Sequence, residues 1–283
     1  MNVLTPTTLD EALDTLAALS GKATPVAGGT DLFVHWPNHA HKQTQPMLDL
    51  SGIESLRAHE WTDTELLLGA TTTYWDIIQD PTAQDEMPML VAAARTVGAT
   101  QIQSRGTWAG NIVNASPAAD GVPALMAMDA VVELTDTTGT ESVRLDEFYL
   151  GYKQMKRRPE QLVTRIRVPR TERDFESFVK VGSRRAQAIT KVGLAITRLG
   201  DDWRVVANSV APVILRCRSV ERMLAAKAPI ASPEDLLAAV RADIAPIDDI
   251  RSTAAYREHV LARVLFYELA SACDWVEAGR ADA

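Results

Sequence analysis

A strand-like segment that runs into two glycines could bind phosphate near the start of the chain. Residues 24–27 read as extended and lead into Gly28-Gly29-Thr30. Because glycine has no Cβ, its backbone N–H group can approach an anion closely. Successive N–H groups that point into one concavity form a phosphate nest without any lysine, and the Thr30 hydroxyl adds a donor. An ordinary turn fits the same residues, so this loop alone does not decide between the two.

A second loop of small and polar residues lies further along the chain. It runs from Thr107-Trp108-Ala109-Gly110-Asn111-Ile112 into residues 114–120. Asn111 and Ser116 can donate hydrogen bonds to phosphate or ribityl oxygens, and Asp120 can accept them from sugar hydroxyls. Two such loops suit a pyrophosphate held from both sides. From the residues alone, a dinucleotide-type ligand and a pair of structural loops both stay open.

Charge, cysteines and histidines exclude several classes of site. Lys and Arg number 29 and Asp and Glu 37, so the net charge of −8 disfavours nucleic-acid binding, which needs phosphate neutralisation. An iron–sulfur cluster normally takes four cysteines, whereas Cys217 and Cys273 stand alone, as expected for reduced, buried thiols of a cytoplasmic protein. His35, His39 and His41 lack a carboxylate or cysteine companion in register, so we predict no metal site. No catalytic triad or pair of carboxylates stands out, so no catalytic residue is assigned.

The start of the sequence has neither a basic leader nor an apolar signal region, and no apolar run has the length of a membrane span. We therefore expect a cytoplasmic protein that meets a membrane only through a partner, if at all.

The elements that must position the two loops follow from periodicity and capping signals. Thr8 and Glu11 form the pattern of a capping box that starts a helix, and Ser20-Gly21 ends it. Thr72 is expected to cap a helix from about residue 74, and 88–97 reads as another helix. The second loop falls in a long irregular stretch over 98–120. Strands are expected at 47–50, 65–70 and 162–168, and a turn at Thr138-Gly139 is expected to join strands at 131–134 and 142–145 in a hairpin.

The C-terminal third predicts strands first and helices afterwards. A boundary is expected at 169–174, followed by a hairpin over 189–199 and 203–210. Ser232-Pro233 signals one helix start, and 252–275 predicts the last long helix. This order is typical of an α+β fold.

The two loops resemble the paired FAD signatures of the flavoprotein subunit family of molybdenum hydroxylases, which includes the medium subunit of carbon monoxide dehydrogenase and the flavin domain of xanthine dehydrogenase. The first family loop reads approximately A-G-G-T-D/S-L, and residues 27–32 match it throughout. The second reads approximately T-I-G-G-N-I, then A-S-P and an Asp. It is matched at Thr107, Gly110, Asn111, Ile112, Ala115, Ser116, Pro117 and Asp120. Residues 148–152 and 178–182 also agree, and the resemblance covers about residues 3 to 275.

The resemblance implies an α+β protein with a two-lobed FAD-binding domain of the vanillyl-alcohol-oxidase-like type, followed by a smaller α+β C-terminal domain. The lobes would span 1–57 and 58–171, and the C-terminal domain 175–280. FAD would be held by Val26, Ala27, Gly28, Gly29, Thr30, Asp31, Leu32, Thr107, Ala109, Gly110, Asn111, Ser116, Asp120, Val163 and Lys180. Val163 also fits a core strand, and Lys180 a solvated one.

The implied function is electron transfer within a heterotrimer. A large molybdenum-pterin subunit would oxidise the substrate, a small subunit with [2Fe-2S] clusters would relay electrons, and this chain would pass them from FAD to an external acceptor. A dimer of heterotrimers is expected. A stand-alone FAD-dependent oxidoreductase with its own organic substrate is the alternative, and a scaffold without flavin is a third.

Two residues depart from the family pattern, and two basic runs have two interpretations. Trp108 replaces a smaller aliphatic residue, so we expect it to pack on the flavin or on a partner subunit. Ala109 replaces a glycine, which would cost about 1 kcal/mol if its φ is positive. The runs 156–158 and 184–185 fit solvated turns or a docking surface for an acidic partner.

Overall fold

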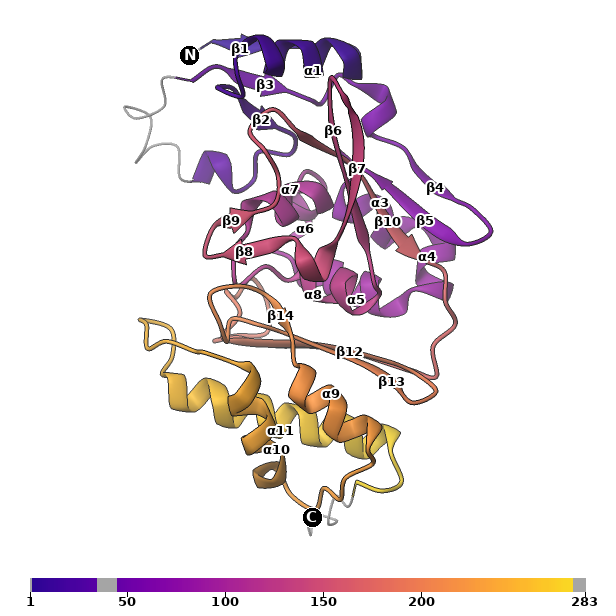
Figure 1. Cartoon of the computed structure of the whole chain (residues 1–283), viewed down its shortest axis with the longest axis vertical. Coiled ribbons are helices and arrows are strands. Elements are labelled where there is room, and N and C mark those ends of the chain that lie inside the picture. Colours follow the sequence, from indigo (N-terminus) through magenta and orange to yellow (C-terminus); the bar gives the residue numbers. More distant parts are fainter. Residues whose placement is uncertain (1, 35–44, 277–283) are drawn as a thin grey trace.

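The computed structural model describes residues 2–34 and 45–276 (Figure 1). It begins with a three-stranded parallel sheet in which β3 (Met47–Asp49) lies between β1 (Val3–Leu4) and β2 (Thr24–Val26). The strands expected at 24–27 and 47–50 are confirmed as β2 and β3. The three histidines at 35, 39 and 41 lie outside the described residues.

Helix α1 (Leu9–Ala18) starts at the expected cap and buries one apolar face. The Thr8 side chain accepts a hydrogen bond from the Glu11 backbone N–H at 3.2 Å. The Glu11 carboxylate, however, accepts from the backbone N–H of Thr7 at 2.8 Å. The reciprocal half of the predicted capping box is therefore displaced by one residue.

A five-stranded antiparallel sheet follows in the sequence. Its order is β4 (His59–Trp61), β5 (Glu65–Gly69), β10 (Leu162–Pro169), β6 (Val131–Asp136) and β7 (Gly139–Arg144). β10 is the central strand of this sheet, and the predicted hairpin of β6 and β7 is confirmed. Short elements follow the hairpin: η3 (Leu145–Glu147), β8 (Tyr149–Gly151) and β9 (Gln154–Met155), while η2 (Glu54–Leu56) precedes β4.

Six helices separate β5 from β6, and two expectations about this region are wrong. They are α3 (Tyr74–Gln79), α4 (Pro81–Glu86), α5 (Pro88–Arg95), α6 (Thr100–Gln103), α7 (Trp108–Asn114) and α8 (Gly121–Ala127). Thr73, not Thr72, caps α3, because its side chain and that of Asp76 form a capping box. The stretch 98–120 is not irregular throughout, since α6 and α7 lie within it.

The C-terminal part is an antiparallel sheet of β11 (Phe175–Val181), β12 (Val192–Leu199), β13 (Asp202–Asn208) and β14 (Leu215–Arg216), followed by α9 (Arg218–Ala225), α10 (Pro233–Asp243) and α11 (Ala254–Ala272). In Figure 1 this sheet lies between the middle helices and α9 to α11. Leu194 and Ile196 pack in the core with these last helices, whereas Ala195 joins the core formed by the elements before β11. Alternate residues of β12 thus face opposite layers.

Cys217 and Cys273 are both buried, free thiols. Among the described residues, none of the helices is long and apolar enough to cross a membrane.

Candidate functional site

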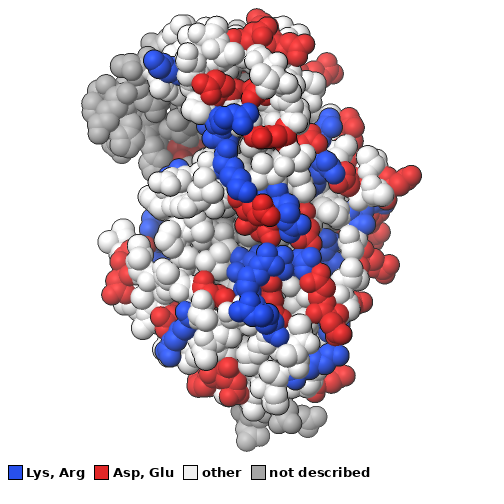
Figure 2. Space-filling view, viewed as in Figure 1, with Lys and Arg blue, Asp and Glu red and all other residues white. Residues whose placement is uncertain are grey.

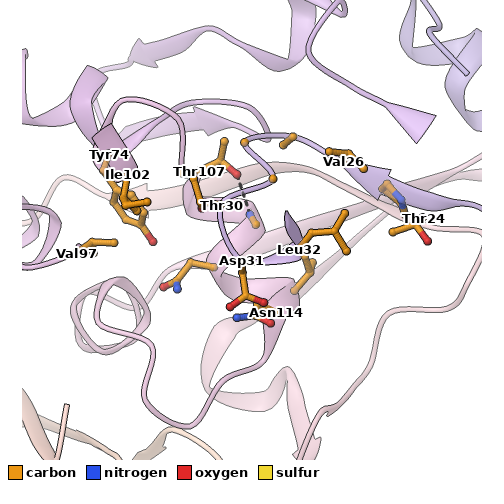
Figure 3. Close-up of a pocket in the computed structure, with 18 residues that line it drawn as sticks. Thr24, Val26, Thr30, Asp31, Leu32, Tyr74, Val97, Ile102, Thr107 and Asn114 are labelled. Carbon is orange, nitrogen blue, oxygen red and sulfur yellow. Dashed lines mark hydrogen bonds between the residues drawn. The ribbon is translucent and has the colours of Figure 1, made fainter. Parts of the chain in front are cut away.

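A pocket of about 420 Å³ lies where the two predicted loops meet (Figure 3). In the close-up, Thr24 and Val26 lie at one end, Tyr74, Val97 and Ile102 at the other, and Thr30 and Thr107 between them. The whole first loop lines it, as do three predicted residues of the second. The predicted lining residues are Val26, Ala27, Gly28, Gly29, Thr30, Asp31, Leu32, Thr107, Gly110 and Asn111.

The first loop needs its two glycines for different reasons. A Cβ on Gly28 would overlap the carbonyl oxygen of Arg105, so this glycine allows the two loops to touch. Gly29 has a φ of +67°, in the left-handed region that disfavours residues with a Cβ. The loop then turns back on itself, because the N–H of Phe33 donates to the Gly29 carbonyl at 2.9 Å.

The second loop is the start of a helix. Thr107 caps α7, and its Oγ accepts from the Gly110 N–H at 3.0 Å. Gly106, which sequence reasoning missed, lets Thr30 approach, because a Cβ there would lie 3.2 Å from the Thr30 Oγ. The loop is tied to α3 by the Tyr74 N–H, which donates to the Gly106 carbonyl at 3.1 Å.

Two buried polar atoms in this lining have no hydrogen-bond partner within the described chain: the Tyr74 hydroxyl and the Asn111 Oδ1. Buried polar groups are normally paired, and each unpaired one costs about 1–3 kcal/mol. Together with glycines that admit no Cβ, these atoms fit a polar ligand in the pocket. Tyr74 carries no sequence motif, and only its place at the start of α3 beside the loop could have suggested it.

The remaining predicted residues lie outside this lining. Ser116 accepts from the Ala118 N–H at 3.3 Å within its own turn. Val163 is 5% exposed and lies in the core of β10 and its neighbouring elements. Asp120 and Lys180 come together, with Lys180 Nζ 2.6 Å from Asp120 Oδ2. Burial raises the pKa of Asp120, and the charge and hydrogen bond of Lys180 oppose that rise.

The segment before α8 is bound to the C-terminal sheet. Thr190 donates a hydrogen bond to Asp120, and Lys180 also donates to the Thr96 carbonyl at 2.9 Å. The Asn208 side-chain amide donates to the Ala119 carbonyl at 2.7 Å. The A-S-P-A-A-D stretch therefore connects the second loop to the C-terminal domain.

The departures at Trp108 and Ala109 have a simple structural explanation. Trp108 is fully buried, with its ring 4.6 Å from that of Tyr74, so the expectation that it packs on a partner subunit is wrong. It fills the core behind the pocket. Ala109 lies inside α7 and is not among the residues with positive φ, so its methyl group costs no backbone strain.

Ion pairs hold the C-terminal domain on the helices. Figure 2 shows Lys and Arg side chains gathered in a band across the middle of the molecule, with acidic side chains among them. Asp129 contacts Arg204 at 3.0 Å, and Asp146 contacts Arg218 at 2.9 Å. These ion pairs connect the C-terminal domain to the elements before it, and each of these two arginines has an acidic partner.

The two basic runs of the sequence, 156–158 and 184–185, differ from each other in their partners. In the first run, Lys156 pairs with Glu147 at 3.2 Å and Arg158 with Asp136 at 2.8 Å. In the second, Arg184 donates to carbonyls of its own turn, and the adjacent position 185 is exposed.

Comparison with known proteins identifies the family of the chain that forms this pocket. The family described as the FAD binding domain in molybdopterin dehydrogenase matches residues 1–171. This chain belongs to that family. The CO dehydrogenase flavoprotein C-terminal domain matches residues 177–272 of this family member.

Relatives of this family member align over most of both chains. The carbon monoxide dehydrogenase medium chain of Hydrogenophaga pseudoflava is 28% identical, covering 89% of this chain and 90% of the relative. The xanthine dehydrogenase FAD-binding subunit of Escherichia coli O157:H7 is 26% identical, covering 90% and 89%. The solved carbon monoxide dehydrogenase of H. pseudoflava lacking the Mo-pyranopterin moiety contains a similar chain, with a TM-score of 0.86, 25% identity and 96% of each chain covered.

These matches confirm the predicted family, the α+β fold with an FAD-binding part followed by a C-terminal domain, and FAD as the cofactor. The chain is an FAD-binding oxidoreductase subunit of the molybdenum hydroxylase family.

Proposed function

We propose that this chain holds FAD between its two loops and passes electrons from iron–sulfur clusters to an external acceptor. The observation that carries the proposal is that both predicted signature loops line one pocket, with unpaired buried polar atoms at its wall. The full proposed binding set remains Val26, Ala27, Gly28, Gly29, Thr30, Asp31, Leu32, Thr107, Ala109, Gly110, Asn111, Ser116, Asp120, Val163 and Lys180.

Within this set the residues divide by task. Gly28 and Gly29 carry no Cβ atom, so a phosphate can approach the backbone N–H groups around them. The Thr107 Oγ already accepts from the Gly110 N–H, so its own proton is free to donate to a ligand oxygen. Asp120 and Lys180 do not line the pocket. They support the second loop indirectly, because their ion pair joins the segment after it to the C-terminal domain. Bound FAD supplies one-electron uptake and two-electron release, which suits the exit of a relay.

We propose that the partners are a large molybdenum-pterin subunit and a small [2Fe-2S] subunit, assembled as a dimer of heterotrimers. Support comes from relatives named as medium chains or FAD subunits. Arg184 and Arg185, exposed on the turn after β11, are proposed as part of the docking face for the small subunit. The buried, free thiols suit the reducing cytoplasm, where we place the complex.

We also propose the three-part division into lobes 1–57 and 58–171 and a C-terminal domain over 175–280. The three-stranded sheet, the five-stranded sheet and the C-terminal sheet each fall within one of these ranges. The family matches over 1–171 and 177–272 are compatible with the second boundary.

The test compares the complete complex with the full-length chain alone. Both are loaded with FAD, mixed anaerobically with the organic substrate of the complex, and followed by flavin absorbance. We expect bleaching only in the complex, and release of FAD rather than FMN on denaturation. Bleaching of the chain alone would favour the stand-alone oxidoreductase. Absence of FAD from the carefully purified complex would overturn the proposal.

A further inference from the structure

Tyr74 is held rigidly at one end of the pocket. It is the first residue of α3, directly after the cap Thr73, whose side chain and that of Asp76 form the capping box of this helix. Its N–H donates to the Gly106 carbonyl at 3.1 Å, and its ring lies 4.6 Å from the Trp108 ring at an angle of 57°. Both the backbone and the ring of Tyr74 therefore have partners within the chain.

The hydroxyl of this buried ring has no hydrogen-bond partner in the described part of the chain, although the residue is only 2% exposed. A phenylalanine would fill the same space without this unpaired group. Tyr149 provides the contrast, because its hydroxyl donates to the Ile112 carbonyl at 3.0 Å. A tyrosine that only packs would be expected to find such a partner.

The ring lies in the pocket lining, beside Val97 and Ile102 (Figure 3). Burial, followed by the charge of Asp120, raises the pKa of Tyr74 well above its usual range. The phenol therefore keeps its proton at neutral pH and can act as a donor.

We infer that Tyr74 is a cofactor-binding residue whose hydroxyl donates a hydrogen bond to an acceptor atom of bound FAD. The inference rests on the proposed function, since it needs FAD in this pocket. It assigns a role to a side chain outside both signature loops. The hydroxyl is left unpaired by the protein because its partner is the ligand.

The test uses the full-length chain stripped of flavin and titrated with FAD, with Tyr74→Phe and Tyr149→Phe as matched variants. Each variant removes one hydroxyl from a largely buried ring. We expect Tyr74→Phe to weaken FAD binding about 5- to 20-fold, as for a lost hydrogen bond. The unfolding midpoint of this flavin-free variant should equal or exceed that of the wild type, because an unpaired buried hydroxyl is gone.

Tyr149→Phe should show the opposite pattern. It loses a hydrogen bond within the protein, so its flavin-free unfolding midpoint should fall while its dissociation constant for FAD stays within about 2-fold of the wild type. Equal FAD affinity in Tyr74→Phe and the wild type would overturn the inference and leave the proposed function standing. So would a fall in the flavin-free midpoint of Tyr74→Phe as large as that of Tyr149→Phe. A wild-type chain that binds no FAD would overturn both.

Discussion

Lys180 and Asp120 form an ion pair that joins the C-terminal sheet to the segment leading into α8. Lys180 Nζ lies 2.6 Å from Asp120 Oδ2, and the two side chains are 11% and 12% exposed. Thr190, also from the C-terminal part, donates to the other carboxylate oxygen. The carboxylate therefore has partners on two segments of the neighbouring domain, and the geometry of the second loop depends on how that domain docks.

Removing one partner of this pair should destabilise the protein more than removing both. Lys180→Met leaves the buried Asp120 carboxylate with the Thr190 hydrogen bond but without a counter-charge, so the free energy of unfolding should fall by about 3 kcal/mol. Asp120→Asn combined with Lys180→Met should recover part of that loss. Denaturant unfolding at pH 7 measures both.

An exposed ion pair supplies the control for this comparison. Asp201 lies 3.2 Å from Lys227 with both side chains more than 60% exposed. Asp201→Asn should therefore change stability by less than about 1 kcal/mol. If Lys180→Met costs no more than Asp201→Asn, the buried pair does not stabilise the docking of the domains.

Gly29→Ala should weaken FAD binding by more than its cost to folding explains. Gly29 has a φ of +67°, and Gly200, in the β12–β13 turn, has a φ of +59° with open space around it. Gly200→Ala should lose about 1 kcal/mol of stability through backbone strain. Gly29→Ala should lose more, because a Cβ there would also overlap the Phe33 ring and must displace it. Only Gly29→Ala should also lose FAD affinity, by roughly 5- to 150-fold. Gly21 is unsuitable as a control, because a Cβ there would collide with Pro159.

Equilibrium titration of the flavin-free chains with FAD, beside thermal unfolding, distinguishes these outcomes. Equal FAD affinity in the Gly29 and Gly200 variants would remove the support for a phosphate nest in the first loop.

Thr107→Ala should lose both a helix cap and FAD affinity, whereas a matched cap elsewhere should affect stability alone. Thr107 accepts from the Gly110 N–H at 3.0 Å, and Thr253, which caps α11, accepts from the Tyr256 N–H at 3.2 Å. Each alanine variant should cost about 1 kcal/mol of stability. FAD affinity should fall in the Thr107 variant only, and Thr107→Ser should restore it. Unchanged FAD affinity in Thr107→Ala would limit the role of this hydroxyl to capping.

The turn of the β6–β7 hairpin should contribute an acid-sensitive part of the stability. Hydrogen bonds from the Thr138 hydroxyl and from Arg158 lower the pKa of Asp136 to about 2 from its ordinary value near 3.8. A lowered folded-state pKa adds stability that is present above pH 4 and lost as the pH falls towards 2. Asp136→Asn should therefore be less stable than the wild type at pH 6, and the gap should close in acid. Urea midpoints across this range check it, and a gap independent of pH would contradict it.

Local signals in the sequence were sufficient for most elements. Thr8 and Ser232-Pro233 do start helices, and the Thr138-Gly139 turn does join two strands, because capping and turn formation depend on neighbours within a few residues. The same reasoning failed over 98–120. Small residues such as Ala109 and Gly110 occur both in loops and in helices that pack closely, so composition did not separate the two.

The turn at the first glycine loop was predictable because two adjacent glycines favour a local turn, and Gly29 does have a positive φ. The burial of Trp108 and the pairing of Lys180 with a carboxylate 60 residues earlier were not. Both depend on how α3, α8 and the C-terminal sheet pack together. The unpaired hydroxyl of Tyr74 belongs to the same class, since a side chain is known to lack a partner only after the whole surrounding core has been placed. Sequence patterning therefore determined which loops could meet a phosphate, and tertiary packing decided which other side chains line the pocket or hold the domains together.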